Sequence, residues 1–225
     1  PFMLPHMWFA ALFAGCPNLF AAAVTSAAGA CESFWANMAD ASFVSNRPNL
    51  ERDARSRTIP IGLYGDAGSF SHQDSLCVFT WGSLLGVGRT MAKRFLIARI
   101  KKSDIAPGTL DAIFRVVAWS FNVMLTGVWP ETDWLGRQLE VRREYLAGRF
   151  RACLCQVRGD WELYCNIFSF PKWNAAANVR WLCAASANGP RSFARCGAGA
   201  PWRATGRTHE SDVAEHEARG LALPA

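Results

Sequence analysis

Ile59-Pro60-Ile61-Gly62-Leu63-Tyr64-Gly65-Asp66-Ala67-Gly68 is the stretch that decides the fold. Its first six residues are mostly apolar, and the Gly-Asp-Ala-Gly that follows is typical of a turn, so we expect a strand over 59–64 that ends at Asp66. Further along the chain, the apolar runs 76–81 and 94–100 predict two more strands. Short connections favour an antiparallel meander of all three strands.

A long apolar segment, 109–125, follows the three strands and predicts a helix. Thr109 is expected to cap its start, and Gly127 with Pro130 is expected to stop it. Because apolar residues fall nearly all round this helix, we expect it to be buried between layers.

A fourth strand is predicted over 150–157, and Arg158-Gly159-Asp160 ends it before a helix that starts at Trp161. The charged segment 132–148 before it is expected to loop into a short helix. The order strand, strand, strand, helix, strand, helix predicts an α/β fold with a ribonuclease H-like (RNase H-like) mixed sheet. The buried helix supplies the crossover that places the fourth strand parallel to the first.

The chain is expected to divide into four segments. Residues 1–31 form an apolar leader that is poorly ordered or helical. Residues 32–58 form a helix, over 32–43, and a linker. Residues 59–170 form the RNase H-like core, and residues 171–225 form an irregular basic extension that contains Trp and Cys.

The apolar leader raises the question of a signal sequence or membrane anchor. It contains an alanine-rich run, 21–30, but no Lys or Arg precedes that run, as a secretory signal would require. Cys16-Pro17-Asn18 interrupts the apolar stretch that a membrane span needs. We therefore do not expect a membrane partner, and a secreted or membrane-tethered domain stays an alternative.

The net charge of +6 and the pI of about 9.1 favour anionic partners such as nucleic acid, although many ordinary domains are mildly basic. No acidic residue lies between Glu162 and Glu210. The basic residues of that stretch are Lys172, Arg180, Arg191, Arg195, Arg203 and Arg207. They predict a surface for a phosphate backbone, and a solvated tail would show the same pattern.

The two strand-end aspartates, Asp66 and Asp160, are the candidate catalytic and metal-binding residues. On adjacent parallel strands they would face each other across a small gap. Carboxylates in such a place hold Mg²⁺ ions, which activate water and stabilise the leaving oxygen of a phosphodiester. The alternative is that each aspartate is an ordinary turn residue.

Eight cysteines are present, at irregular spacing in a chain that does not need disulfides. Cys77, Cys153 and Cys155 lie in apolar strand-like runs, where a buried free thiol is the usual outcome. These features indicate a reducing, intracellular location, either in the nucleus or outside it.

Several motifs together resemble a large multicopy family of uncharacterised protist proteins, over roughly Glu32 to Glu210. They are 59–68 with Asp74-Ser-Leu, Gly127-Val-Trp-Pro, Asp133-Trp, Gly159-Asp160-Trp, Phe170-Pro-Lys-Trp-Asn, Trp181-Leu-Cys183, Pro201-Trp-Arg-Ala-Thr and Thr208-His209-Glu210. That family in turn resembles the Kyakuja-Dileera-Zisupton class of transposases. The second resemblance implies that Asp66 and Asp160 are the first two of three acids that bind metal.

The chain departs from the pattern of these relatives in two ways. Arg180-Trp-Leu-Cys183 replaces a Cys-x-x-Cys pair, so a structural zinc is not expected, although Cys183 with Cys196 and His209 is an alternative ligand set. The third acid is expected beyond Ala225. Glu210 and Glu215 are substitutes for it only if they are not part of a frayed tail.

These observations predict a degenerate or truncated, mobile-element-derived nuclease domain without catalytic activity, and with Mg²⁺ as cofactor if it is active. No small-molecule cofactor is expected. The alternative is a non-catalytic module that binds DNA or another nucleic acid.

Overall fold

The computed structural model describes residues 2–38, 52–69, 74–140, 144–168, 199–201 and 214. The chain divides into two units, Pro1–Gly159 and Asp160–Ala225.

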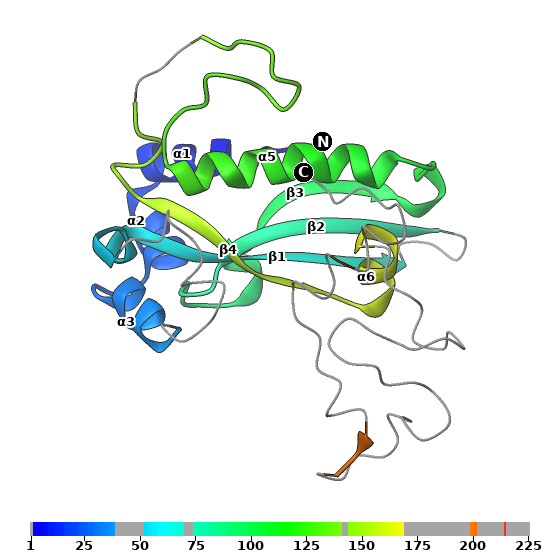
Figure 1. The fold of residues 1–225 in the computed structure, drawn as a ribbon, viewed down its shortest axis with the longest axis horizontal. Helices are drawn as coiled ribbons and strands as arrows, with labels where there is room; N and C mark the ends of the chain where they lie inside the picture. Colours follow the sequence, from blue (N-terminus) through cyan, green and yellow to red (C-terminus); the bar gives the residue numbers. More distant parts are fainter. Residues whose placement is uncertain are drawn as a thin grey trace. The chain divides into compact units, whose positions relative to one another are not determined.

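A four-stranded mixed sheet forms the centre of the first unit (Figure 1). Its strands are β1 (Thr58–Ser69), β2 (Ser75–Ser83), β3 (Phe95–Lys101) and β4 (Arg151–Gly159), in the order β3-β2-β1-β4. The first three pair antiparallel, and β4 pairs parallel with β1. The α/β class and the mixed sheet predicted from the sequence are confirmed.

Strand β1 is longer than the sequence predicts. Its pairing with β2 continues through Asp66, opposite Val78, to Ser69, opposite Ser75. The predicted turn at residues 65–68 is therefore wrong, and Asp66 lies within the strand. Glycine weakens a strand but does not end it when a neighbouring strand supplies the hydrogen bonds.

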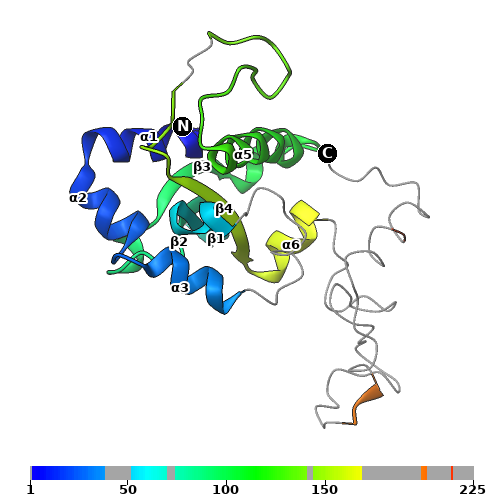
Figure 2. The same cartoon turned by 60° about the vertical axis from the view of Figure 1, so that its left-hand side comes forward.

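Helix α5 (Thr109–Thr126) connects β3 to β4 and lies on one face of the sheet, beside α1 (Pro5–Gly15) (Figures 1 and 2). It buries one side only, so the prediction of a helix buried all round is wrong. Its exposed positions include Asp111, Ala112, Arg115, Ala118 and Asn122. The helix is the outer layer of a two-layer arrangement, and its small and polar residues face outward.

Of the two predicted helix ends of α5, the C-terminal one is confirmed and the N-terminal cap is not. Gly127, with φ of +74°, is the left-handed C-cap, as the sequence indicates. Thr109 does not cap the start: Gly108 is the N-cap residue, and the Thr109 hydroxyl instead accepts a hydrogen bond from the Ala106 amide at 3.1 Å.

The N-terminal region is helical. It comprises α1, α2 (Pro17–Phe20), a π-helical turn (Ala21–Thr25) and α3 (Ala30–Asn37). Its first residues are fixed to β3: the Met3 amide donates to the Ile97 carbonyl at 2.7 Å, and the Trp8 indole donates to the Leu96 carbonyl at 3.0 Å. The apolar leader thus packs against the edge strand of the sheet.

Helix α3 is shorter than the predicted 32–43, and residues 39–51 lie outside the described part. Trp35 of α3 is fully buried against Cys153 of β4, and its indole donates to the Thr58 carbonyl at 2.7 Å. This contact anchors the helix beside the start of β1. The predicted linker, where described, contains a 3₁₀ helix (Arg52–Arg57).

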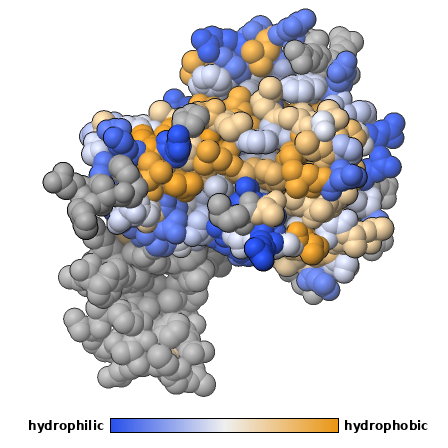
Figure 3. Space-filling model, turned by 180° about the vertical axis from the view of Figure 1, so that it is seen from behind, coloured by the Kyte–Doolittle hydropathy of each residue, from blue (hydrophilic) through white to orange (hydrophobic). Residues whose placement is uncertain are grey.

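The run Pro17–Asn37 is long and apolar enough to span a membrane by length and composition, a test that core helices and signal sequences also pass. Several of its residues are buried in the fold: Phe20, Ala23, Val24, Cys31 and Trp35. Seen from the side opposite to Figure 1, the surface carries a band of hydrophobic residues bordered by hydrophilic ones (Figure 3). Large hydrophobic residues exposed near the N-terminus are Phe2, Met3, Met7 and Leu19.

The segment between α5 and β4 is irregular where it is described, so the short helix predicted within 132–148 is not found there. Asp133 organises it by accepting hydrogen bonds from the amides of Leu135 and Arg137, both at 2.9 Å, and by pairing with the Arg137 guanidinium at 2.7 Å. Burial alone would raise the pKa of Asp133, and the bonds from Arg137 and Leu135 outweigh it and lower that pKa.

The second unit begins with α6 (Trp161–Phe168), as the sequence predicts. Residues 169–198, which hold much of the predicted basic extension, lie outside the described residues.

Candidate functional site

Asp66 lies on the face of the sheet that α5 does not cover. Gly65 pairs with Phe79, whose ring packs edge-on against Phe114 of α5 at 5.1 Å. Because side chains alternate along a strand, Tyr64 and Asp66 point to the opposite face. The carboxylate of Asp66 is therefore exposed rather than enclosed beneath the helix.

Two hydrogen bonds hold the Asp66 carboxylate. The Tyr64 hydroxyl donates to Oδ2 at 2.7 Å, and the Ala67 amide donates to Oδ1 at 2.8 Å. The hydrogen bond to Asp66, helped by burial and by the carboxylate charge, raises the pKa of Tyr64, and Arg94 opposes this shift. Tyr64 therefore stays a neutral donor that orients the carboxylate.

Asp160 is the first residue of the second unit, and it caps α6. Its Oδ1 accepts a hydrogen bond from the Leu163 amide at 2.8 Å, an N-cap interaction. Within the first unit, Gly65 of β1 and Gly159 of β4 are register partners. Each of these glycines directly precedes one of the two aspartates in the chain.

The other predicted site residues lie outside the described residues: Lys172, Arg180, Arg191, Arg195, Arg203 and Arg207. The same holds for the alternative zinc ligands Cys183, Cys196 and His209, and for Glu210 and Glu215. Within the part of the chain that is described, no three His, Cys, Asp or Glu side chains gather as a metal-binding group.

Six cysteines are described, and they are thiols that are not joined in disulfides: Cys16, Cys31, Cys77, Cys153, Cys155 and Cys165. Burial, with the nearby charge of Glu32, raises the pKa of Cys31 to about 11. Cys31 is therefore a protonated, unreactive thiol at neutral pH.

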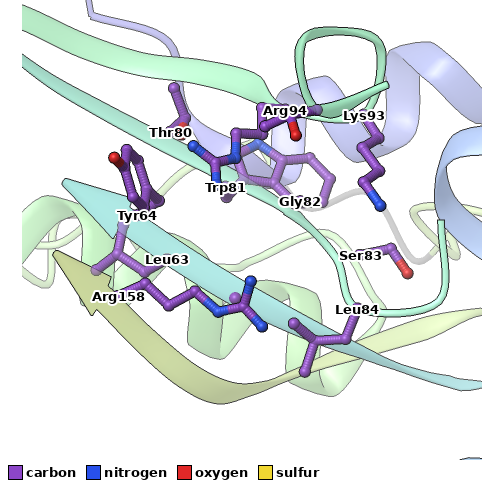
Figure 4. Close-up of a pocket in the computed structure, with 12 residues that line it drawn as sticks. Leu63, Tyr64, Thr80, Trp81, Gly82, Ser83, Leu84, Lys93, Arg94 and Arg158 are labelled. Carbon is purple, nitrogen blue, oxygen red and sulfur yellow. The ribbon is translucent and has the colours of Figure 1, made fainter. Parts of the chain in front are cut away.

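A cavity of about 240 Å³ lies on the same face of the sheet as Asp66, and Tyr64 is one of the residues that line it (Figure 4). Its lining comes from β1, β2, the segment before β3, and the end of β4. The lining residues are Gly62, Leu63, Tyr64, Thr80, Trp81, Gly82, Ser83, Leu84, Thr90, Lys93, Arg94 and Arg158. Three of these side chains are cationic, four carry hydroxyl groups, and none is acidic.

The three cations differ in how they are held. The Arg94 guanidinium stacks over the Tyr64 ring, 3.9 Å from its centroid. The Lys93 ammonium donates to the Gly86 carbonyl at 2.9 Å. Arg158, the register partner of Tyr64 on β4, extends across the cavity (Figure 4). No carboxylate of the described residues forms an ion pair with these three groups, and the charged side chains that line the cavity are all positive.

Glycines on the strands make room for this arrangement. A Cβ on Gly82 would collide with the Lys93 carbonyl oxygen, so only glycine lets the Lys93–Arg94 backbone approach β2 this closely. No motif in the sequence marks Lys93, Arg94 or Arg158 as site residues. The parallel pairing of β4 with β1 brings Arg158 close to Lys93 and Arg94. No local sequence pattern predicts this pairing.

Gly82→Ala is expected to lower the free energy of unfolding by about 1–3 kcal/mol, because the new methyl group meets backbone and the Lys93–Arg94 segment must shift. Urea unfolding followed by circular dichroism measures the change. Gly68→Ala is the matched control, since a Cβ there has no atom within 4 Å. Equal stabilities of the two variants would contradict the close approach.

Comparison of the chain with protein-family models, with curated proteins and with solved structures gives no match. The family resemblance and the RNase H-like topology therefore stay predictions. Two motif residues on which that resemblance rests have structural roles: Gly127 ends α5, and Asp133 organises the following segment.

Proposed function

We propose that this chain is an RNase H-like, transposase-derived nuclease domain that has lost strand cleavage. Asp66 and Asp160 are two ligands of a Mg²⁺ site in this proposal, and no third acid joins them among the described residues. The single observation that supports it most is the register pairing of Gly65 with Gly159, directly before the two aspartates, on neighbouring parallel strands.

The element order adds support. Three antiparallel strands, a crossover helix and a fourth strand parallel to the first give the sheet order β3-β2-β1-β4. This is the order expected for the first part of an RNase H-like core. Asp66 lies within β1 and Asp160 directly follows the neighbouring parallel strand β4. Carboxylates close together at such positions can share a hard divalent ion, and Mg²⁺ suits such oxygen ligands.

Loss of catalysis follows from the ligand count. Phosphodiester cleavage with two metals needs shared and separate carboxylate ligands for both ions. The two aspartates of the described part of the chain, one of which also caps a helix, supply too few. A single weakly held ion is what this pair can retain.

Asp66→Asn is expected to weaken Mn²⁺ binding, with Mn²⁺ used in place of Mg²⁺, by tenfold or more, because the amide removes one of two anionic ligands. Titration followed by electron paramagnetic resonance measures it, and Asp160→Asn should give a similar loss. Glu131→Gln, an exposed loop substitution, is the control. Unchanged Mn²⁺ binding in Asp66→Asn, or DNA cleavage by the unaltered chain, would refute the proposal.

A second candidate function is nucleic-acid binding without a metal. The observation that favours it is the cationic cavity, together with the basic residues between Glu162 and Glu210. DNA binding that weakens with salt and persists in both aspartate variants would support this candidate over the first.

A further inference from the structure

We propose that the cavity formed by Lys93, Arg94 and Arg158 binds a phosphate group of a nucleic-acid strand. The site is distinct from the proposed Mg²⁺ site, because none of its lining residues is an aspartate and it needs no metal. It rests on the second candidate function, nucleic-acid binding, and deepens it by naming the group that is bound and the residues that bind it.

Charge is the first argument. Three cations from two distant parts of the chain meet around one cavity, and no acidic side chain lines it. Like charges this close repel, and a bound anion relieves that repulsion. Surface cations of a domain are more commonly interspersed with acids, so the segregation here points to an anionic ligand.

Free hydrogen-bonding capacity is the second argument. The Lys93 ammonium has three hydrogen-bond donors and uses one of them for the bond to the Gly86 carbonyl. Arg158, in the described part of the chain, has no hydrogen bond or ion pair. The Arg94 guanidinium stacks over the Tyr64 ring and also forms a hydrogen bond with the Tyr64 side chain. A guanidinium has five N–H donors, so others remain to bind an oxyanion. Lysine and arginine together match the several oxygens of a phosphate.

An unsatisfied hydroxyl is the third argument. Thr80 lines the cavity, and its buried Oγ1 has no hydrogen-bond partner. Buried polar atoms are rarely left without one, because the unpaired state costs free energy. A phosphate oxygen would supply an acceptor for this hydroxyl.

Size and lining decide between a whole small molecule and one group of a larger ligand. Pockets for drug-sized ligands are usually 300–1,000 Å³ and mainly apolar. This cavity has about 240 Å³ and a mostly polar lining, so it suits one charged group that belongs to a longer chain. The phosphodiesters of a nucleic acid are such groups.

The test uses the full chain in EDTA, so that the metal site does not contribute. Binding of a fluorescein-labelled single-stranded oligonucleotide is measured by anisotropy at two salt concentrations, with inorganic phosphate as competitor. Arg158→Gln and Lys93→Gln are each expected to weaken binding about tenfold and to reduce its salt dependence. Arg115→Gln removes the same charge from α5, on the other face of the sheet, and is expected to change binding less than twofold.

Each outcome bears on the phosphate site. Parallel loss in both cavity variants, with competition by inorganic phosphate, supports it as a nucleic-acid site. Phosphate binding that depends on Arg158 but is not displaced by the oligonucleotide keeps the phosphate site and overturns the nucleic-acid source. If all three variants bind the oligonucleotide as tightly as the unaltered chain, the proposal is overturned and the nucleic acid binds at another surface. Failure of Mn²⁺ binding in the aspartate variants tests only the metal site and leaves this result intact.

Discussion

Replacing Trp81 with alanine is expected to lower the free energy of unfolding by about 3–5 kcal/mol. Trp81 lies on the central strand β2 and is fully buried. Its ring packs 4.9 Å from Phe95 of β3 and 6.4 Å from Phe9 of α1, centroid to centroid. Truncation leaves a cavity where the sheet meets the N-terminal helix. A loss of this size is a large fraction of the stability of an ordinary domain.

Urea unfolding monitored by circular dichroism measures the Trp81→Ala effect. Trp81→Phe is expected to cost much less, because the indole Nε1 that it removes has no hydrogen-bond partner. Trp134→Ala, at a partly exposed ring, is the control for tryptophan loss. Similar losses for Trp81→Ala and Trp134→Ala would show that the N-terminal helix and the sheet do not share a core.

The stability of the fold is expected to fall by about 3 kcal/mol between pH 6.5 and pH 4 through His6 alone. Burial lowers the pKa of His6 from 6.5 to about 4. The side chain is held between α1 and α5, where Nδ1 lies 2.8 Å from the Ser120 hydroxyl, and Trp119 and Trp129 contact the ring edge-on. The neutral imidazole is therefore the form that the fold accommodates.

The sign follows from proton binding. Between these two pH values the unfolded chain protonates His6 and the folded chain does not, so the unfolded state binds more protons and stability rises with pH. The contribution is complete above pH 6.5 and is lost as the pH falls toward 4.

His6→Gln should remove this part of the pH dependence. Asp74 and Asp133, whose pKa values are also lowered, titrate in both proteins, so the difference between the two stability curves isolates His6. NMR titration of the His6 ring gives its pKa directly. A His6 pKa near 6.5 in the folded protein would show that the N-terminal helix does not bury this side chain.

Local sequence predicted the regular elements well. The apolar runs at 76–81 and 94–100 correspond to β2 and β3, and the helix predicted over 109–125 is α5. The sequence predicts Gly127 as the end of this helix, because glycine adopts the positive φ of a helix C-cap without strain. Short-range periodicity and capping carry this information, so no tertiary contact was needed to obtain it.

Where the local predictions were wrong, contacts with distant parts of the chain determined the structure. The residues Gly65–Gly68 have the composition of a turn, yet pairing with β2 carries the strand through to Ser69. The apolar leader is fixed by bonds to Ile97 and Leu96, which lie about ninety residues away in the chain. Hydrogen bonds from a distant partner outweigh local turn propensity.

By itself, the sequence determined the α/β class, the order of the main elements, and the two aspartates that follow Gly65 and Gly159. Only the tertiary structure decided that Asp66 is an exposed strand residue held by Tyr64, and that Lys93, Arg94 and Arg158 surround one cavity. The physical reason is that the periodicity of apolar residues indicates which side of a single helix or strand is buried. It does not indicate which other element lies beside it. The meeting of residues 64 and 158 depends on the parallel pairing of β1 with β4 across a crossover helix, which no local pattern encodes.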